Sequence, residues 1–347
     1  MLTRSIALAL IAMTACAGAG AQARSGPDAP GSNPLFRDVF TADPAPIVHA
    51  GRVYLYTGHD EAGPDEMFNI TEWLVFSSAD MKTWEAHGPV MAPTDFAWAA
   101  RDAWASEVEE RDGRFYFYTT VEHDQSHPGK AIGVAVSDSP TGPLVDARGS
   151  ALVTNDMTTA ATHSWDDIDP TVLIDDDGSA WIFWGNGQLY YAPLARNMTE
   201  LAGPIRTAEI THFEEGPWLH KHAGTYYLTY AGIDESVSTD EQIHYSTAPA
   251  ITGPWTYRGM LTGPGENSFT IHPGIVEFEG QWYLFYHDAS QTIAGIEGAL
   301  GRRSVRVEYL YHNEDGTLEP VEQTDAGVSV PPRTLPATRS IEKKETP

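Results

Sequence analysis

The sequence has 347 residues, 41% of them hydrophobic and 20% charged, which is the composition of a soluble globular protein. Its net charge of −27 argues against nucleic acids and anionic membrane surfaces as partners, because both repel an acidic protein. Frequent aromatic, Gly and Pro residues are typical of many short strands joined by tight turns.

Residues 1–23 have the pattern of a secretory signal peptide. The segment MLTRSIALALIAMTACAGAGAQA contains one Arg, then an apolar run, then small residues that end in an A-x-A cleavage pattern at Ala23. The apolar run is too short to span a membrane. Cys16 is the only cysteine and is an alternative lipid-attachment site, whereas cleavage after Ala23 would leave a mature protein without thiols. We expect export to the periplasm or the extracellular space in either case.

After the signal, the chain reads as one domain between two less regular segments. We expect residues 24–33 to form a polar linker and residues 327–347, which are Pro-rich and charged, to form a disordered tail. Between them, residues 34–326 repeat a glycine turn followed by an aromatic strand, as in GRVYLYTGHD, DGRFYFYTT and EGQWYLFYHD. Five irregular repeats of about 45 to 65 residues, with about four strands each, predict an all-β, five-bladed β-propeller. An irregular β-sandwich is the alternative.

Polar side chains recur at one position of this repeat, eight or nine residues before the turn glycine. They are Asp43, Asp169, Glu215 and His272, and the second repeat has Trp104 and Ala105 at this position. The first strand of each propeller blade lines the central axis, so we expect these side chains to converge at one end of the channel. Clustered carboxylates raise one another's pKa and keep one protonated, which is what a general acid and a general base in glycosidic bond cleavage require.

Several segments in this order resemble glycoside hydrolase family 43 across about residues 34–326. They include FTADPAPIVHAGRVYLYTGHDE, WLVFSSADMKTW, DAWASEV, GKAIGVAVSDSPTGP, DDIDPTVLIDDDG, EGPWLHK, HPGIVEF and RRSVRVEYLYHNEDGT. The sequence is most similar to the branch of single-domain β-xylosidases and α-L-arabinofuranosidases. This resemblance implies a five-bladed propeller that hydrolyses glycosides with inversion of the anomeric configuration.

The resemblance also implies a role for each of the three phased carboxylates. Asp43 would be the general base that activates water, and Glu215 the general acid that protonates the leaving oxygen. Asp169 would tune the pKa of the acid and orient it. Glu214 precedes Glu215 in the same strand, so we expect its side chain to alternate to the other face and to be structural or solvated.

The resemblance places His272 near a divalent cation, commonly calcium, that is held largely through water. A histidine whose hydrogen bonds are satisfied in the protein core is the alternative, since calcium prefers oxygen ligands. No organic cofactor is implied.

Two residue types are candidates for binding the sugar. Arg303 resembles a family arginine that reaches into the sugar pocket, and the adjacent Arg302 is left open as the alternative. Trp104 is the candidate wall for the apolar face of the sugar, with Trp73 and Trp165 as weaker candidates, because buried aromatic residues often belong to the core instead.

The expected function is that of a β-xylosidase that releases xylose from the non-reducing end of plant cell-wall xylooligosaccharides. An α-L-arabinofuranosidase, or dual activity on arabinoxylan fragments, is the alternative. An invertase-like enzyme would need an Asn before its Asp and a Cys after its Glu, whereas Ala42 precedes Asp43 and Gly216 follows Glu215. A non-catalytic carbohydrate-binding propeller is a more distant possibility that has no need of three converging acids.

Overall fold

The computed structural model describes residues 29–64, 66–158 and 163–333. The predicted signal peptide, including Cys16, lies outside these residues, as do residues 24–28 of the predicted linker and 334–347 of the predicted tail. Within the described part of the chain, no helix is long and apolar enough to cross a membrane.

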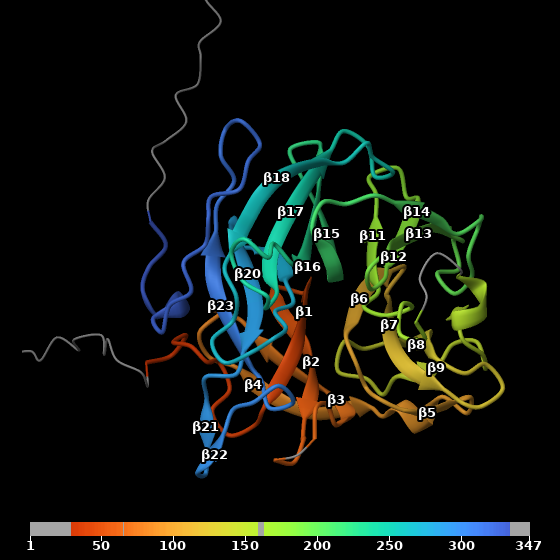
Figure 1. Ribbon diagram of the computed structural model, residues 1–347, viewed down its shortest axis with the longest axis horizontal. Helices are drawn as coiled ribbons and strands as arrows, with labels where there is room; N and C mark the ends of the chain where they lie inside the picture. The colour runs from red at the N-terminus through yellow and green to blue at the C-terminus, as the bar shows by residue number, and fades with distance from the viewer. Residues whose placement is uncertain (1–28, 65, 159–162, 334–347) are drawn as a thin grey trace, which may run out of the picture.

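The described strands form five antiparallel sheets arranged around a common axis, with one small hairpin outside the ring (Figure 1). Blade 1 contains β1 (Thr41–His49), β2 (Arg52–Asp60), β3 (Ile70–Ser78) and β4 (Glu85–Met91). Blade 2 contains β5 (Ala99–Arg101), β6 (Ser106–Arg111), β7 (Arg114–His123), β8 (Lys130–Ser137), β9 (Val145–Asp146) and β10 (Val153–Thr154). Blade 3 contains β11 (Thr171–Ile174), β12 (Ala180–Trp184), β13 (Leu189–Leu194) and β14 (Arg206–Ala208). Blade 4 contains β15 (Phe213–His222), β16 (Thr225–Gly232), β17 (Gln242–Ala248) and β18 (Thr256–Thr262). Blade 5 contains β19 (Gly274–Phe278), β20 (Gln281–Asp288) and β23 (Ser304–Leu310), and the hairpin pairs β21 (Thr292–Ile293) with β22 (Ile296–Glu297).

The first strands of the blades form the inner ring. Each of these strands contacts the next one around the ring, in the order β1, β6, β11, β15, β19, and β19 contacts β1 to close the ring. Figure 1 shows β1, β6, β11 and β15 facing the middle of the molecule, while the later strands of each blade lie farther out. The predicted five-bladed propeller is confirmed, and the alternative of a β-sandwich is wrong.

The predicted glycine turns join the first strand of each blade to the second. Gly51, Gly113, Gly224 and Gly280 all have positive φ, and each follows another residue with positive φ. Two consecutive residues in this region make the tight turn whose twist matches that of an antiparallel hairpin. The repeated glycine therefore marks an equivalent point, the end of the first strand, in each blade.

The N-terminal segment closes the ring beside the last strand. The amide of Leu35 donates to the carbonyl of Val305 at 2.9 Å, and the amide of Thr41 donates to the carbonyl of Arg303 at 2.9 Å. The side-chain oxygen of Asn33 accepts the amide of Val307 at 2.9 Å. Blades 1 and 5 are therefore joined by residues that are far apart in the sequence.

The ordered fold extends beyond the predicted boundaries at both ends. In the predicted linker, Asn33 is buried and hydrogen-bonded to blade 5, so residues 29–33 pack on the propeller instead of hanging free. In the predicted tail, Gly327–Ser329 forms a turn of 3₁₀ helix, and the side chain of Val328 is fully buried. The composition of these segments gave no indication of this packing.

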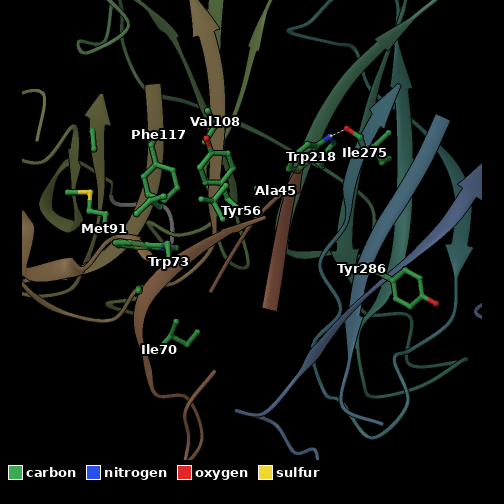
Figure 2. Packing of buried hydrophobic residues seen from close by; sticks show 14 of the residues in the cluster. Ala45, Tyr56, Ile70, Trp73, Met91, Val108, Phe117, Trp218, Ile275 and Tyr286 are labelled. Carbon is green, nitrogen blue, oxygen red and sulfur yellow. Dashed lines mark hydrogen bonds between the residues drawn. The ribbon is translucent and has the colours of Figure 1, made fainter. Parts of the chain in front are cut away.

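Aromatic side chains fill the space between neighbouring blades. In blades 1 and 2, the rings of Trp73 and Phe117 lie 5.3 Å apart at an angle of 76°. In blades 4 and 5, the indole of Trp218 donates to the carbonyl of Ile275 at 3.1 Å, the contact dashed in Figure 2. Burial of this apolar area fixes the blades relative to one another and makes a rigid support for the axial side chains.

Candidate active site

The backbone bends in the same unusual way near the start of three of the inner strands. Asp43 and Asp169 have φ values of 53° and 57°, and each directly precedes a proline. Gly216, which also precedes a proline, has a φ of 55°. Asp is among the few residues other than Gly that populate this region readily. The Asp-Pro and Gly-Pro pairs thus turn the chain sharply near the starts of β1, β11 and β15.

A pocket of about 360 Å³ opens at this end of the propeller. The structure brings all six of the predicted site residues to its wall, namely Asp43, Trp104, Asp169, Glu215, His272 and Arg303. The convergence expected from the repeat phase is therefore observed.

Asp43 is buried among cationic and imidazole groups. Its Oδ1 lies 3.1 Å from His272 Nδ1 and 3.2 Å from Arg303 Nη1. Its amide donates to Nδ1 of His287 at 3.2 Å. Burial opposes ionisation of Asp43, but the charges of Arg303 and His272 outweigh this effect and hold its pKa well below the usual range. Asp43 is therefore a carboxylate, the form that a general base requires.

Glu215 is held from two sides. Its Oε1 lies 2.9 Å from His272 Nε2, and its Oε2 accepts the side-chain amide of Asn186 at 2.6 Å. His272 therefore lies between Asp43 and Glu215, with one ring nitrogen facing each carboxylate. Burial raises the pKa of Glu215, but the hydrogen bond and charge of His272 exceed this effect, so the net shift is downward.

Asp169 differs from the other two carboxylates because it lies farther from the nitrogens of the His272 ring. Its Oδ2 accepts the amide of Gly216 at 3.1 Å and lies 3.8 Å from His272 Nε2. Burial is the main cause that raises its pKa to about 8, and the nearby carboxylates of Glu215 and Asp43 add to this effect. Of the three clustered carboxyl groups, Asp169 has a raised pKa, whereas the pKa values of Asp43 and Glu215 are lowered. The role of Glu215 as the acid stays a prediction.

Arg303 is the arginine that lines the pocket, and Arg302 is not. Arg303 makes a two-pronged ion pair with Asp60, with its Nε 2.9 Å from Oδ2 and its Nη2 3.1 Å from Oδ1. This pair aims the remaining nitrogen, Nη1, at Asp43. Arg302 instead donates to the carbonyls of Ala62 and Gly63, in a loop outside the pocket.

The three candidate tryptophans have different positions. Trp104 lines the pocket, and the buried ammonium group of Lys130 lies 3.6 Å from the centre of its ring. Trp165 also lines the pocket, and half of its surface is exposed. Trp73 is fully buried and donates from its indole to the carbonyl of Trp104 at 2.8 Å, so it belongs to the core and supports the wall from behind.

Glu214 does not follow the expected alternation. Strand β15 has irregularities in its pairing with β16 on both sides of Glu215, so the simple two-residue period is broken there. Glu214 consequently lines the same pocket as Glu215. Burial and the charge of Glu215 raise its pKa. The expectation that this side chain points to the other face was wrong because of the bulge.

Three residues that hold the catalytic candidates in place were not predicted from the sequence. They are Asp60, which pairs with Arg303, His287, which accepts the amide of Asp43, and Asn186, which binds Glu215. All three lie at or just beyond the ends of second strands, which in a hairpin lie beside the starts of first strands. The repeated His-Asp pair that ends YTGHD and YLFYHD was the available signal.

The cluster has the chemistry of a cation site. Asp169, Glu215 and His272 each offer a ligand atom, and these atoms lie within 4.8 Å of one another. Despite burial, the three surrounding carboxylates raise the pKa of His272 well above its usual range, which shows that the position favours positive charge. A small cavity of about 20 Å³ shares Asp43, Asp169 and His272 with the pocket, and the buried hydroxyl of Ser106 on its wall has no hydrogen-bond partner among the described residues. The residues present therefore fit a cation held partly through water.

Comparisons with known proteins agree with this geometry. The family model for glycosyl hydrolases family 43 matches residues 32–318. A xylosidase/arabinosidase from Bacteroides ovatus is 32% identical to this chain, with 82% of this chain and 96% of the relative covered. An arabinoxylan arabinofuranohydrolase from Bacillus subtilis is 31% identical, with 86% of this chain and 65% of the relative covered.

A solved structure has the same architecture. A family 43 β-xylosidase/α-arabinofuranosidase from a compost microbial metagenome, in complex with xylotriose and in a calcium-free form, superposes with a TM-score of 0.73. It is 31% identical to this chain, and the match covers 84% of this chain and 97% of that structure. The fold, the pocket and these matches together define a glycoside hydrolase. The chain belongs to glycosyl hydrolases family 43, as its resemblance implied.

Proposed function

We propose that this protein is an inverting exo-acting β-xylosidase that releases xylose from the non-reducing end of xylooligosaccharides. The observation that carries the proposal is the placement of Asp43 and Glu215 on opposite edges of the His272 ring. Inverting glycosidases separate their two carboxyl groups by roughly 6.5–9.5 Å, which leaves room for a water molecule. The His272 ring lies between the Asp43 and Glu215 carboxylates and holds them apart, which suits a separation of this kind.

Asp43 would act as the general base. Arg303 and His272 keep it ionised, and Asp60 fixes the guanidinium so that Asp43 cannot move away. A water molecule beside Asp43 would lose its proton to this carboxylate as its oxygen attacks the anomeric carbon of the sugar. Arg303 lowers the basicity of Asp43, and we infer that it also stabilises the orientation of the carboxylate during attack.

Glu215 would act as the general acid. In the free protein its Oε1 lies 2.9 Å from His272 Nε2, and the surrounding carboxylates raise the pKa of this histidine. A sugar that fills the pocket displaces water and increases the burial of Glu215, and this raises its pKa so that it takes up a proton. Protonated Glu215 then protonates the glycosidic oxygen as the bond breaks. Asp43, which stays ionised, opposes a second negative charge on Glu215 and so favours this protonated form. Asp169 would orient the acid, because it accepts the amide of Gly216, the residue after Glu215.

A divalent cation such as calcium would be held by His272, mostly through water. It would supply the positive charge that the three carboxylates around His272 favour. The chemistry of the step remains with Asp43 and Glu215.

The volume and position of the pocket support an exo mode of action. About 360 Å³ is near the lower end of the roughly 300–1,000 Å³ of ligand sites, and the two carboxylates lie on its wall near the axis. A terminal sugar ring can enter such a pocket more easily than the middle of a chain. An α-L-arabinofuranoside is the second candidate substrate, favoured by the relatives named for arabinose release.

The proposal is tested by replacing Glu215 with Gln and measuring hydrolysis of xylobiose and of 4-nitrophenyl glycosides. Loss of a general acid typically lowers rates by about 10²–10⁴-fold, so xylobiose turnover should fall by about that factor. Xylotriose binding, measured by calorimetry, should persist within a few-fold. Unchanged turnover of xylobiose in Glu215→Gln would falsify the assignment of the acid.

Substrate preference is tested with the unaltered enzyme. We expect turnover of 4-nitrophenyl β-xyloside to exceed that of 4-nitrophenyl α-L-arabinofuranoside at equal concentrations. The reverse order would reassign the protein as an arabinofuranosidase that uses the same carboxylates.

A further inference from the structure

The mouth of the active-site pocket has exposed apolar side chains that catalysis by the carboxylates does not explain. Met67, Trp165 and Phe269 all line the pocket, and their exposed fractions are 66%, 50% and 46%. Large hydrophobic groups exposed together around a cavity usually mark a binding surface. Trp165 offers the largest flat surface among them.

One face of the Trp165 ring is supported by the protein. The rings of His163 and Trp165 are stacked with their centres 4.5 Å apart and an angle of 24° between their planes. Since the His163 ring covers one face of the indole and half of Trp165 is exposed, the opposite face is available to a ligand. A supported, flat aromatic ring can bind the apolar face of a sugar with little loss of side-chain entropy.

Trp165 lies on the side of the pocket that holds the acid. The amide of Asn186 donates to the carbonyl of Asp166, the next residue after Trp165, at 3.1 Å. The side chain of the same Asn186 donates to Glu215 at 2.6 Å. One residue therefore ties the Trp165 loop to the carboxylate that faces the leaving group.

Other aromatic residues of the pocket are associated with the base. The guanidinium of Arg303, which contacts Asp43, lies 5.1 Å from the centre of the Phe68 ring. Phe68 in turn packs edge-on against Trp104, with ring centres 6.1 Å apart. The aromatic residues therefore form two groups, one beside the base and one beside the acid. A sugar chain cleaved between base and acid would place its terminal ring in the first group and its leaving group in the second.

Glu214 adds a polar group on the acid side. Its carbonyl accepts the amide of Gly187 at 2.7 Å, which fixes its backbone near Asn186. Its carboxylate lines the pocket and makes no hydrogen bond to any residue that the structure describes. An unpaired, half-buried carboxylate is suited to accept a hydrogen bond from a sugar hydroxyl.

We propose that Trp165 is the stacking platform of a leaving-group subsite that binds the second xylose ring of a xylooligosaccharide, with Glu214 accepting one of its hydroxyls. This inference rests on the proposed function, because it needs a substrate with a sugar on both sides of the scissile bond. It assigns Trp165 to the leaving group, whereas Trp104 contacts the terminal sugar.

The test compares ligands that reach the subsite with one that does not. Trp165→Ala should lower kcat/KM for xylobiose and xylotriose by about 10-fold, mainly through KM, because the lost stacking area is about that of one sugar face. The inhibition constant of free xylose, which fills only the terminal pocket, should change less than twofold. Trp165→Phe should restore most of the loss, and Glu214→Gln should have a smaller effect of the same kind.

Val237→Ala is the matched control, since Val237 is 51% exposed but does not line the pocket. An equal loss of xylose inhibition in Trp165→Ala, or unchanged kinetics with xylotriose, would overturn the assignment. Calorimetry with xylotriose in the Glu215→Gln background keeps the two proposals separable. If the unaltered enzyme does not hydrolyse xylobiose, the proposed function fails, whereas a selective loss of xylotriose binding in Trp165→Ala still supports the platform.

Discussion

The two ends of strand β15 show that buried side chains can be favoured in a charged form at one end and in a neutral form at the other. At one end, Glu215 lies in a cluster of charged groups with His272. At the other end, His220 and His222 meet His312, which follows β23, and the Nε2 atoms of His220 and His312 lie 3.2 Å apart. Burial lowers the pKa of His220 well below its usual range and that of His312 to about 4.

The difference lies in the neighbours and not in the depth. The ring of His220 stacks on Tyr227 with centres 4.7 Å apart, and Trp282 packs against it at 5.2 Å. The other charges that act on His220 come from His312 and His222, and both disfavour its protonation. Burial without a counter-charge lowers the pKa of a histidine, whereas the carboxylates around His272 raise its pKa. One strand therefore links a charged catalytic end to a neutral, aromatic, structural end.

The largest expected effect comes from removing charge at the catalytic end. Asp43→Asn should lower kcat for xylobiose by about 10³-fold, because an amide cannot accept a proton from water. The amide is close in shape to the carboxylate, so the melting temperature should change little in comparison. Steady-state kinetics and a thermal melt of the same preparation measure both quantities. If activity and stability fall together, Asp43 has a structural role and the comparison between the two ends fails.

A smaller effect is expected from calcium. After exhaustive treatment with a chelator, turnover of 4-nitrophenyl β-xyloside should fall several-fold and recover when calcium is added back, because the cation balances the carboxylates around His272. Thermal stability measured with and without calcium gives a second readout of binding. Full activity and an unchanged melting temperature after calcium removal would leave His272 with a hydrogen-bonding role alone.

The smallest effect is a pH dependence of stability from the neutral end. The unfolded chain takes up protons on histidine near pH 6.5, but folded His312 does so only near pH 4, so stability should fall as pH drops between these values. His312 is partly exposed, and its contribution is limited to roughly 1–2 kcal/mol. Denaturant unfolding at pH 7 and pH 4.5 should give a smaller difference for His312→Asn than for the unaltered protein.

His127→Asn is the control for this measurement, because the His127 side chain is 47% exposed and lies outside the cluster. A pH dependence that is the same in all three proteins would contradict the neutral state of the histidine cluster. Activity at neutral pH should be retained in His312→Asn, since the catalytic end is unaltered.

The repeating hairpin, and the convergence of the carboxylates that follows from it, could be predicted from the sequence. The turn glycines mark the end of each first strand, and counting back from them selects Asp43, Asp169 and Glu215, which the structure brings to one pocket. This inference needs only the turn geometry and the symmetry of a propeller, so it survives irregular spacing between repeats.

Two kinds of feature could not be predicted in this way. They are side-chain directions that depend on a bulge and contacts between residues far apart in the sequence. The bulge in β15 that turns Glu214 into the pocket has no simple pattern in the sequence. His312 reaches His220 across a blade boundary and 92 residues of sequence, so no local period relates them. The raised pKa of Asp169 depends on its burial and on its distances to His272, Glu215 and Asp43, which a sequence does not contain.

The closure of the ring by the N-terminal segment has a consequence for folding. Asp43 belongs to blade 1, but the groups that keep it ionised, His272, His287 and Arg303, all come from blade 5. The base therefore acquires its working environment only when the first and last parts of the chain meet, and such distant contacts form late and slowly. Recovery of hydrolysis during refolding should consequently report completion of the whole ring, whereas strand formation in single blades can occur earlier.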